Sequence, residues 1–351
     1  MKKLFITFVI LICIIPSAGM IFLGESPPGA NEVAAVMPQF SDPEIGFNWK
    51  ILTEFTDYIG KRFTFRQDLI TVNSALFAKA FGLSAVDDII LGKEDWLFYE
   101  RTLPDYFGEN VLNDEYIAKI SAKLKSMEGH CADNGKNFLF VIAPNKNSVY
   151  PQYMPYPQKE IIKNSDKLLK KLAEDNVSHI NLFEKFAKTD DTIYHKWDSH
   201  WNNLGAAIAC DEILSELNLT DENFSTDSYA KTKSFQGDLY NMLYPKGKGL
   251  DENIEFARKM KFIYDQPING PDAITIKTTC EGKTGKVLVF RDSFGNALYP
   301  FIAESFSEAV FSRKTPYKIE LADETDADTV IIIMAERNIA QFDKHIPIEN
   351  E

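Results

Sequence analysis

A chain of 351 residues, 45% of them hydrophobic, is long enough to bury a substantial core as one large domain or two smaller ones. Its 26 phenylalanines and 14 tyrosines are typical of a folded globular protein and argue against an intrinsically disordered chain. The net charge of -13 argues against a nucleic acid as a partner, because the protein has no surplus of cations to neutralise a phosphate backbone.

The N-terminus has the pattern of a membrane-targeting segment. Lys2 and Lys3 precede an apolar run over residues 4–23, and about 20 apolar residues are enough to span a bilayer. The positive flank predicts that the start of the chain stays in the cytoplasm while the remainder is exported. We therefore expect residues 1–24 to be a signal-anchor in the cytoplasmic membrane, with a cleaved signal peptide as the alternative. The protein would then be extracytoplasmic, either membrane-anchored or secreted.

The rest of the chain has the pattern of a linker followed by one α/β domain. Residues 25–45 contain several prolines and little periodicity, which predicts a linker. Residues 46–351 are expected to form the domain, with a helical segment at 46–85 and an irregular insertion of loops and short strands at 218–280. Residues 92–99 are expected to form a turn followed by a short aromatic strand, and further predicted strands lie at 138–143, 179–182, 287–290, 309–311 and 329–334. Predicted helices lie at 116–127, 168–172, 204–217 and 296–306. Since strands alternate with helices, we expect a right-handed, doubly wound parallel sheet in a three-layer α/β/α architecture.

The cysteines give no sign of a metal site. The predicted exported part contains Cys131, Cys210 and Cys280, and no spacing typical of zinc ligands is present. We expect these thiols to be small buried groups, and we expect neither a metal nor another cofactor.

A serine follows a predicted strand at a position where reactive groups gather in α/β proteins. Ser293 lies three residues after the apolar run 287–290 and directly before a predicted helix. This turn would place the serine at the carboxyl edge of the sheet, near N–H groups that favour a developing oxyanion. Ser293 is therefore a candidate nucleophile, and an ordinary helix N-cap is the alternative.

Asp198 and His200 have the spacing of an acid and a base. In an extended backbone, residues two apart point to the same side, so the carboxylate could orient the imidazole and stabilise its protonated form. The alternative is an acidic helix cap with an unrelated histidine beside it. His195 is a competing base that lacks a carboxylate at the same offset.

The segment from Asp198 to Ala206, with the sequence DSHWNNLGA, resembles the Asp-Thr-His-Trp segment of the alginate O-acetylation proteins and related SGNH-hydrolase-like acetyltransferases, the DHHW type. The order of motifs, with Asp-Ser-Phe at 292–294 coming later, resembles a circular permutation of ordinary SGNH esterases. Further matching segments are Trp96-Leu97-Phe98, Phe63-Thr64-Phe65-Arg66, Ser148-Val149-Tyr150-Pro151 and Gly237-Asp238-Leu239. The resemblance covers roughly residues 45–340.

Other residues near these motifs are candidates for binding substrate or the oxyanion. Arg291 replaces the glycine usual in SGNH esterases and either points away or serves the site. Arg337 and Asn338 follow the strand at 329–334, where an oxyanion loop is expected, although a charged helix start is an equal alternative. Lys146 could bind a polyanionic substrate or be a solvated loop lysine.

The aromatic residues beside the Asp-x-His segment form a further group of candidates. The side chains of Tyr194, Trp197 and Trp201 could stack on sugar rings, although core packing is the better expectation for at least two of them.

The resemblance implies an extracytoplasmic O-acetyltransferase that uses Ser293, His200 and Asp198. It also implies an exopolysaccharide or cell-wall glycan as acceptor, and a membrane-bound O-acyltransferase as the partner that supplies acetyl groups. A carbohydrate O-acetylesterase with the same triad and a non-catalytic glycan-binding or assembly subunit are the alternatives.

Overall fold

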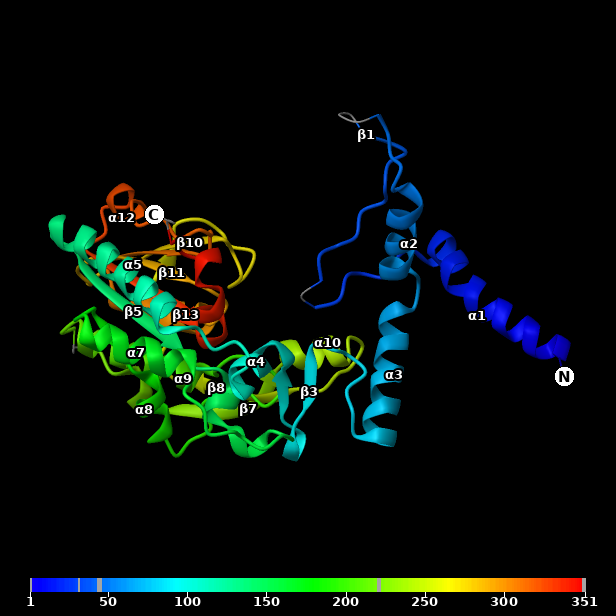
Figure 1. Ribbon diagram of the computed structural model, residues 1–351, viewed down its shortest axis with the longest axis horizontal. Helices are drawn as coiled ribbons and strands as arrows, with labels where there is room; N and C mark the ends of the chain where they lie inside the picture. Colours follow the sequence, from blue (N-terminus) through cyan, green and yellow to red (C-terminus); the bar gives the residue numbers. More distant parts are fainter. Residues whose placement is uncertain (1, 31, 43–45, 220–221, 349–351) are drawn as a thin grey trace. The chain divides into compact units, whose positions relative to one another are not determined.

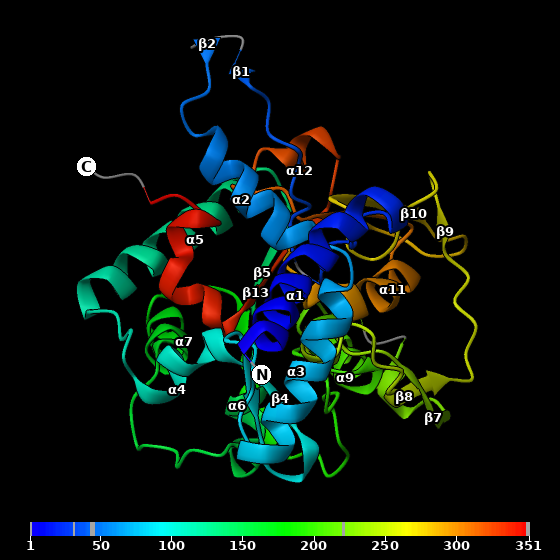
Figure 2. The ribbon, with the colours of Figure 1, turned by 90° about the vertical axis from the view of Figure 1, so that its right-hand side faces the viewer.

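The computed structural model describes residues 2–30, 32–42, 46–219 and 222–348, and the chain divides into two compact units (Figures 1 and 2). One unit consists of Met1–Leu91 and Gln236–Leu250, and the other of Gly92–Phe235 and Asp251–Glu351. The predicted boundaries at residues 24 and 45 remain predictions.

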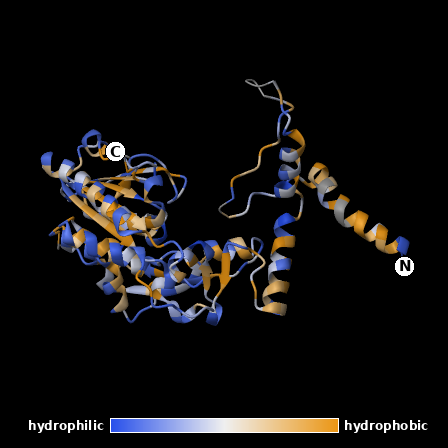
Figure 3. Cartoon of the chain, viewed as in Figure 1, coloured by the Kyte–Doolittle hydropathy of each residue, from blue (hydrophilic) through white to orange (hydrophobic). Residues whose placement is uncertain are grey.

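The first unit is mainly helical. Its elements are α1 (Lys2–Leu23), β1 (Ser41–Asp42), β2 (Gly46–Phe47), α2 (Ile51–Arg62), α3 (Arg66–Phe81), β3 (Ile89–Leu91) and α10 (Asp238–Leu243). Figure 3 shows α1 as apolar along nearly its whole length, and among the described residues it is the one helix long and apolar enough to cross a membrane. The helical segment expected at 46–85 is broken between α2 and α3, where Phe65 takes a left-handed conformation with φ of 68°. Helix α10 contacts α3 and β3, so part of the predicted insertion packs within this unit.

The second unit is built on a seven-stranded sheet with the order β6-β5-β13-β11-β12-β10-β9. The strands are β5 (Asn137–Ala143), β6 (His179–Ile180), β9 (Ile263–Tyr264), β10 (Thr275–Thr279), β11 (Lys286–Arg291), β12 (Glu308–Ser312) and β13 (Thr329–Ala335). The five strands from β6 to β12 are parallel, as predicted. However, β10 runs antiparallel to both of its neighbours, β12 and β9. The expectation of a wholly parallel sheet is therefore wrong at this end of the sheet. Strand β10 alternates exposed and buried residues, and it therefore lacks the continuous apolar run that marks a doubly covered strand.

Helices cover both faces of this sheet, which confirms the α/β architecture. On one face, α5 (Asp114–Asp133), α7 (Asn164–Glu174) and the turn-like helix η5 (Glu336–Lys344) share a buried apolar cluster with alternate residues of β5, β11 and β13. On the other face, α9 (Asn203–Glu216) and α11 (Gly295–Ser305) pack against each other, as Figure 2 shows. Strand β13 is buried along its whole length, as expected for a central strand between two helical layers.

Shorter elements connect these layers. They are η1 (Lys93–Asp95), β4 (Leu97–Tyr99), η2 (Glu100–Thr102), α4 (Leu103–Phe107), α6 (Lys146–Val149), η3 (Pro151–Tyr153), α8 (Leu182–Ala187), η4 (Phe224–Thr226), β7 (Tyr229–Phe235), β8 (Asp251–Phe256) and α12 (Leu321–Glu324). The predicted strand at 179–182 ends two residues early, because the Asn181 side chain accepts hydrogen bonds from the N–H groups of Phe183 and Glu184 and starts α8. Strands β7 and β8 form an antiparallel pair in the region expected to hold short strands.

The central strands β5, β13 and β11 end at the same edge of the sheet. Ala335 of β13 pairs with Ala143 of β5, and Arg291 of β11 pairs with Ile333. The segments that follow these strands carry Lys146, Arg337 and Ser293, so the fold gathers them at the carboxyl edge.

Candidate active site

Ser293 lies in a tight turn between β11 and α11. Asp292 holds this turn: its Oδ1 accepts a hydrogen bond from the Phe294 N–H at 3.0 Å, and its Oδ2 accepts from the N–H of Ala335 at 2.7 Å. The first carboxylate oxygen shapes the turn, and the second ties it to the end of β13. Residue Phe294 occupies the N-cap position of α11 without a side-chain capping bond. The alternative of Ser293 as an ordinary N-cap is therefore not what the structure shows.

The structure brings Ser293, His200 and Asp198 together. The distance from His200 Nε2 to Ser293 Oγ is 2.8 Å, and that from His200 Nδ1 to Asp198 Oδ1 is 2.7 Å. The same carboxylate oxygen accepts the backbone N–H of His200 at 2.9 Å. The Asp198 side chain is 7% exposed and that of His200 is 20% exposed. A buried acid therefore orients a partly accessible base toward a hydroxyl, in the order that nucleophilic catalysis requires.

The loop that carries Asp198 and His200 is closed at its base by a bridge between Tyr194 and Trp201. The indole N–H of Trp201 donates to the carbonyl of Phe294 at 3.0 Å, which joins this loop to the serine turn. The Phe294 ring meets the His200 ring edge-on at 4.9 Å and the Trp201 ring at 5.0 Å. The aromatic residues around the motif thus hold the two halves of the site together.

Tyr194 and Trp201 are therefore core residues and do not form a sugar platform. Each is 1% exposed, and the Tyr194 hydroxyl donates to the carbonyl of Pro144 at 2.6 Å. Full burial raises the pKa of Tyr194 well above its ordinary value. This outcome agrees with the expectation that at least two of the three aromatic residues pack in the core.

Lys146 is neither a solvated lysine nor an exposed binding group, so both predicted roles are wrong. Its side chain is buried, and its ammonium donates to the carbonyls of His195 and Lys196 at 3.0 Å each and of Asp198 at 2.5 Å. The sequence alone could not show this, because the carbonyl groups lie about 50 residues further along the chain.

Arg291 is completely buried. Its guanidinium donates to the side chain of Asn296 at 2.5 Å and to the carbonyls of Pro271 at 2.7 Å and Ala273 at 3.3 Å. Burial lowers its pKa to about 10. A Cβ on residue 295 would lie 2.5 Å from the Arg291 side chain, which explains the glycine there. The candidate role of Arg291 in binding substrate is therefore replaced by a role in fixing the loop at 271–273.

Arg337 and Asn338 have different surroundings. The Asn338 amide donates to Asp292 Oδ2 at 2.8 Å, so it supports the serine turn. The Arg337 guanidinium is half-buried and lies over two rings, 5.3 Å from the centre of Phe294 and 5.6 Å from that of Tyr99. Because Phe294 also contacts His200, Arg337 brings a positive charge close to the triad.

Most N–H groups at the start of α11 are already used. Those of Phe294, Gly295 and Asn296 donate to Asp292 Oδ1, the Asp292 carbonyl and the Ser293 carbonyl, respectively. The helix start is therefore a weaker oxyanion site than the sequence predicts.

His195, the competing base, is engaged elsewhere. Its ring stacks on Phe235 with centroids 3.7 Å apart, and its Nδ1 is 2.9 Å from the carbonyl of Glu252. Burial lowers the pKa of His195. Its contacts are those of a neutral, packed imidazole.

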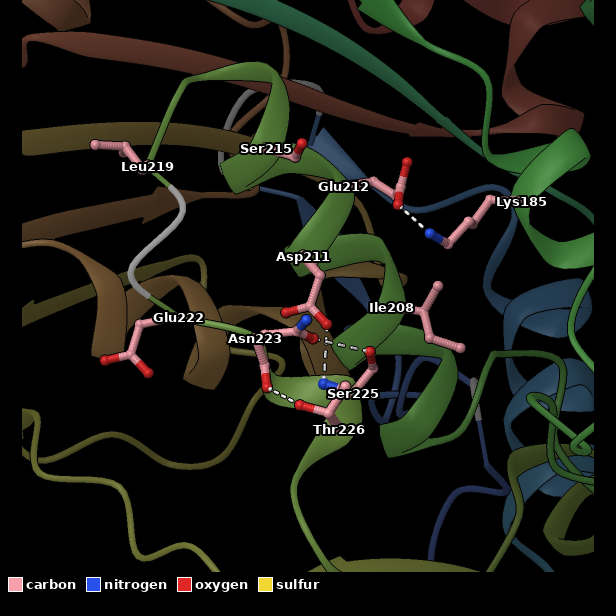
Figure 4. A pocket seen from close by; sticks show the side chains of 10 residues that line it. All are labelled: Lys185, Ile208, Asp211, Glu212, Ser215, Leu219, Glu222, Asn223, Ser225 and Thr226. Atoms are coloured by element: carbon pink, nitrogen blue, oxygen red, sulfur yellow. Dashed lines mark hydrogen bonds and ion pairs between the residues drawn. The ribbon is translucent and has the colours of Figure 1, made fainter.

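A pocket beside α9 is separate from the triad (Figure 4). It lies between this helix and the segment at 222–226, and its polar groups bind one another. Asp211 accepts hydrogen bonds from the N–H groups of Phe224 and Ser225, and Glu212 forms an ion pair with Lys185 at 2.5 Å. These polar groups of the pocket lining therefore stabilise the local structure around α9.

Asp292 and Phe294 belong to the Asp-Ser-Phe motif at 292–294, but the sequence assigned neither of them a role. Asp292 holds the serine turn, and Phe294 contacts His200, Trp201 and Arg337. Their place in this motif, directly on either side of the candidate serine, was the signal that the sequence offered.

The fold and this geometry define an SGNH hydrolase-like α/β domain with a Ser-His-Asp arrangement at the carboxyl edge of its sheet. Residues 89–260 match the family model described as "SGNH hydrolase-like domain, acetyltransferase AlgX". The resemblance inferred from the sequence is thereby confirmed.

Individual proteins match the chain at low sequence identity. The chain is 24% identical over 165 residues to a protein described as probable alginate O-acetylase AlgJ of Pseudomonas putida, a match that covers 44% of this chain. It spans 42% of that relative's length, which is less than half. Among solved structures, PatB1 of Bacillus cereus has a TM-score of 0.55 and 17% identity, with 72% of this chain and 96% of that chain covered. A DHHW family protein from Eubacterium siraeum has a TM-score of 0.51 and 18% identity, with 66% and 89% covered. These structures share the fold.

Proposed function

We propose that this protein is an extracytoplasmic O-acetyltransferase that moves an acetyl group onto hydroxyls of a polysaccharide through an acyl-enzyme on Ser293. The observation that carries the proposal is the continuous chain of short contacts from Asp198 through His200 to the Ser293 hydroxyl. Asp198 and His200 lie within residues 89–260, which match an acetyltransferase family model, and Ser293 follows the matched residues in the same sheet domain.

In the first half-reaction, Ser293 Oγ attacks the carbonyl carbon of a donor acetyl ester. His200 Nε2, at 2.8 Å, takes the hydroxyl proton as the new C–O bond forms. Asp198 keeps Nδ1 protonated and stabilises the imidazolium. Collapse of the tetrahedral intermediate expels the donor alcohol, which receives the proton from His200, and leaves acetyl-Ser293.

In the second half-reaction, a sugar hydroxyl attacks the acetyl-Ser293 carbonyl. His200 accepts the hydroxyl proton and then returns a proton to Ser293 Oγ as the acyl bond breaks. The balance is one acetyl group moved and no net proton consumed. The same steps with water as the acceptor would make the protein an esterase.

Arg337 is the group we assign to the developing negative charge. Its guanidinium is held over Phe294, which is directly next to Ser293 in the chain. A cation at this position stabilises an oxyanion more strongly in a partly buried site than in water. It takes the place of the helix N–H groups that are already bonded.

The proposed surroundings follow from the sequence pattern and from the relatives. The apolar helix α1 would anchor the enzyme or direct its export. The similarity to a probable alginate O-acetylase supports a polysaccharide acceptor. A membrane-bound O-acyltransferase would supply the acetyl groups.

The test is acetyl transfer from a chromogenic acetyl ester to a panel of oligosaccharides, with mass spectrometry of the protein. We expect acetylated sugar, and an acetyl adduct on Ser293 when the reaction is stopped early. Ser293→Ala should abolish both. Ser305→Ala is the matched control, because Ser305 lies at the other end of the same helix and donates to the Phe301 carbonyl. Release of acetate with no sugar product would identify an esterase. Equal turnover by wild type and Ser293→Ala would exclude this nucleophile and favour a non-catalytic subunit.

A further inference from the structure

Three carbonyl groups of the loop that carries Asp198 converge on one buried ammonium. Lys146 Nζ donates to the carbonyls of His195, Lys196 and Asp198. An ammonium has three N–H donors, so this set can use all of them. The Lys146 side chain is 3% exposed, and its charge lies 5.4 Å from the centre of the Trp96 ring and 5.2 Å from that of Phe98.

This arrangement constrains the backbone of the loop. Residues 195–200 form no regular secondary structure, and the backbone bond that crosses the loop, from the His195 N–H to the His200 carbonyl, is long at 3.4 Å. Carbonyl oxygens directed at one point repel one another unless a cation lies between them. Burying that cation costs free energy unless such acceptors surround it. The inward-facing carbonyls and the buried charge therefore depend on each other.

We propose that Lys146 is a positioning residue of the triad, which fixes the Asp198 carboxylate behind His200 by holding the Asp198 backbone. This inference rests on the proposed function of Ser293, His200 and Asp198. The shortest of the three contacts is to the carbonyl of Asp198 itself, at 2.5 Å. A shift of that backbone moves the carboxylate with it, and the carboxylate is 2.7 Å from the imidazole that it orients.

Lys146 lies where the fold can hold it firmly. It is the first residue of α6, and β5 delivers it to the carboxyl edge of the sheet. The preceding Asn145 is fixed through its backbone N–H, which donates to the buried Glu336 carboxylate at 2.8 Å. The Lys146 side chain therefore reaches from the end of the central strand β5 to the loop that carries Asp198.

The central experiment is a double-mutant cycle in the full chain, with turnover of an acetyl ester as the readout. Lys146→Met keeps the length of the side chain and removes the charge. We expect kcat to fall about 100-fold with KM nearly unchanged, because a misplaced catalytic group affects the transition state more than substrate binding. In an Asp198→Ala background the same substitution should cause no further loss, since the group it positions is absent.

The matched control is Lys136→Met. Lys136 directly precedes β5, at the other end of that strand, and donates to the carbonyl of Ala327 at 2.9 Å and that of Ala322 at 3.4 Å. It resembles Lys146 in its contacts but is remote from the triad. Its substitution should lower stability and leave kcat unchanged.

The outcomes separate the two proposals. Full activity of Lys146→Met, or an equal further loss in the Asp198→Ala background, would overturn the positioning role while leaving Ser293 as the nucleophile. Undiminished activity of Ser293→Ala would overturn the proposed function instead. If Lys146→Met does not fold, Lys146→Gln, which retains two N–H donors, enters the same cycle. Failure of both variants to fold would assign Lys146 to stability alone.

Discussion

His200 Nε2 and Ser293 Oγ lie 2.8 Å apart although 93 positions separate them in the chain. The contact depends on a second link between the same two loops, the hydrogen bond from the Trp201 indole to the Phe294 carbonyl. Since Trp201 follows His200 directly and Phe294 follows Ser293 directly, this bond constrains both reacting groups. The alignment of the candidate base and nucleophile is therefore a property of the aromatic core behind them.

Replacement of Trp201 by phenylalanine tests this link. Trp201→Phe retains an aromatic ring but removes the indole N–H that donates to the Phe294 carbonyl, at a cost of about 1 kcal/mol in the free energy of unfolding. We expect kcat to fall about 10-fold or more as the two loops separate. Urea unfolding and ester turnover measure the two effects. Trp197→Phe is the control, because that indole donates to the carbonyl of Asp95 in a more exposed setting. A similar loss of kcat in both variants would contradict the special role of Trp201.

Removal of the charge on Asp198 tests the orientation of the base. Asp198→Asn places an amide against His200 Nδ1, which can favour the wrong tautomer of the imidazole. By analogy with other Ser-His-Asp sites, kcat should fall by about 10⁴ with little change in KM. Steady-state kinetics at saturating ester provides the measurement. The exposed Asp191→Asn is the control, and a loss below 10-fold for Asp198→Asn would contradict the triad.

The juxtaposition of Ser293, His200 and Asp198 could be predicted because its signals were local. A strand, a turn and a helix start placed Ser293, and a two-residue offset placed Asp198 beside His200. The buried cations Lys146 and Arg291 could not be predicted in this way. Both bind backbone carbonyls supplied by loops distant in sequence, and a carbonyl is present at every position. The antiparallel strand β10, which lies between β12 and the edge strand β9, escaped prediction because one of its faces is exposed.

Arg337 should matter through its charge. Arg337→Met removes the cation over Phe294, and we expect kcat to fall about 10²–10³-fold, as for loss of one oxyanion donor. Arg337→Lys retains the charge but loses the planar group that lies over the rings, so it should keep part of the activity. Comparison of kcat for the two variants is the measurement. Equal losses would indicate that packing against Tyr99 and Phe294, and not charge, is the contribution.

A second carboxyl near the site, that of Asp105, should make stability depend on pH. Burial, together with the nearby Glu336 carboxylate, raises the pKa of Asp105 from 3.8 to about 6. Below 3.8 the carboxyl is protonated in the folded and unfolded states alike, and pH has no effect through it. Between 3.8 and about 6 the unfolded chain loses the proton while the folded chain keeps it, so stability falls as pH rises. Above that window the loss is constant, at about 3 kcal/mol.

Asp105→Asn should therefore stabilise the protein at neutral pH and leave it unchanged in acid. The substitution can be accommodated, because the neighbouring Asn110 and Asn145 donate to Asp105 while their own Oδ1 atoms are buried and, in the described part of the chain, have no hydrogen bond. Rotation of either amide would present an acceptor to the new side-chain N–H. Urea unfolding of wild type and variant from pH 4 to 8 should show a difference that grows by about 3 kcal/mol and levels off above pH 6. The exposed Asp190→Asn controls for the loss of one carboxylate. A difference that does not change with pH would show that Asp105 is ionised throughout this range.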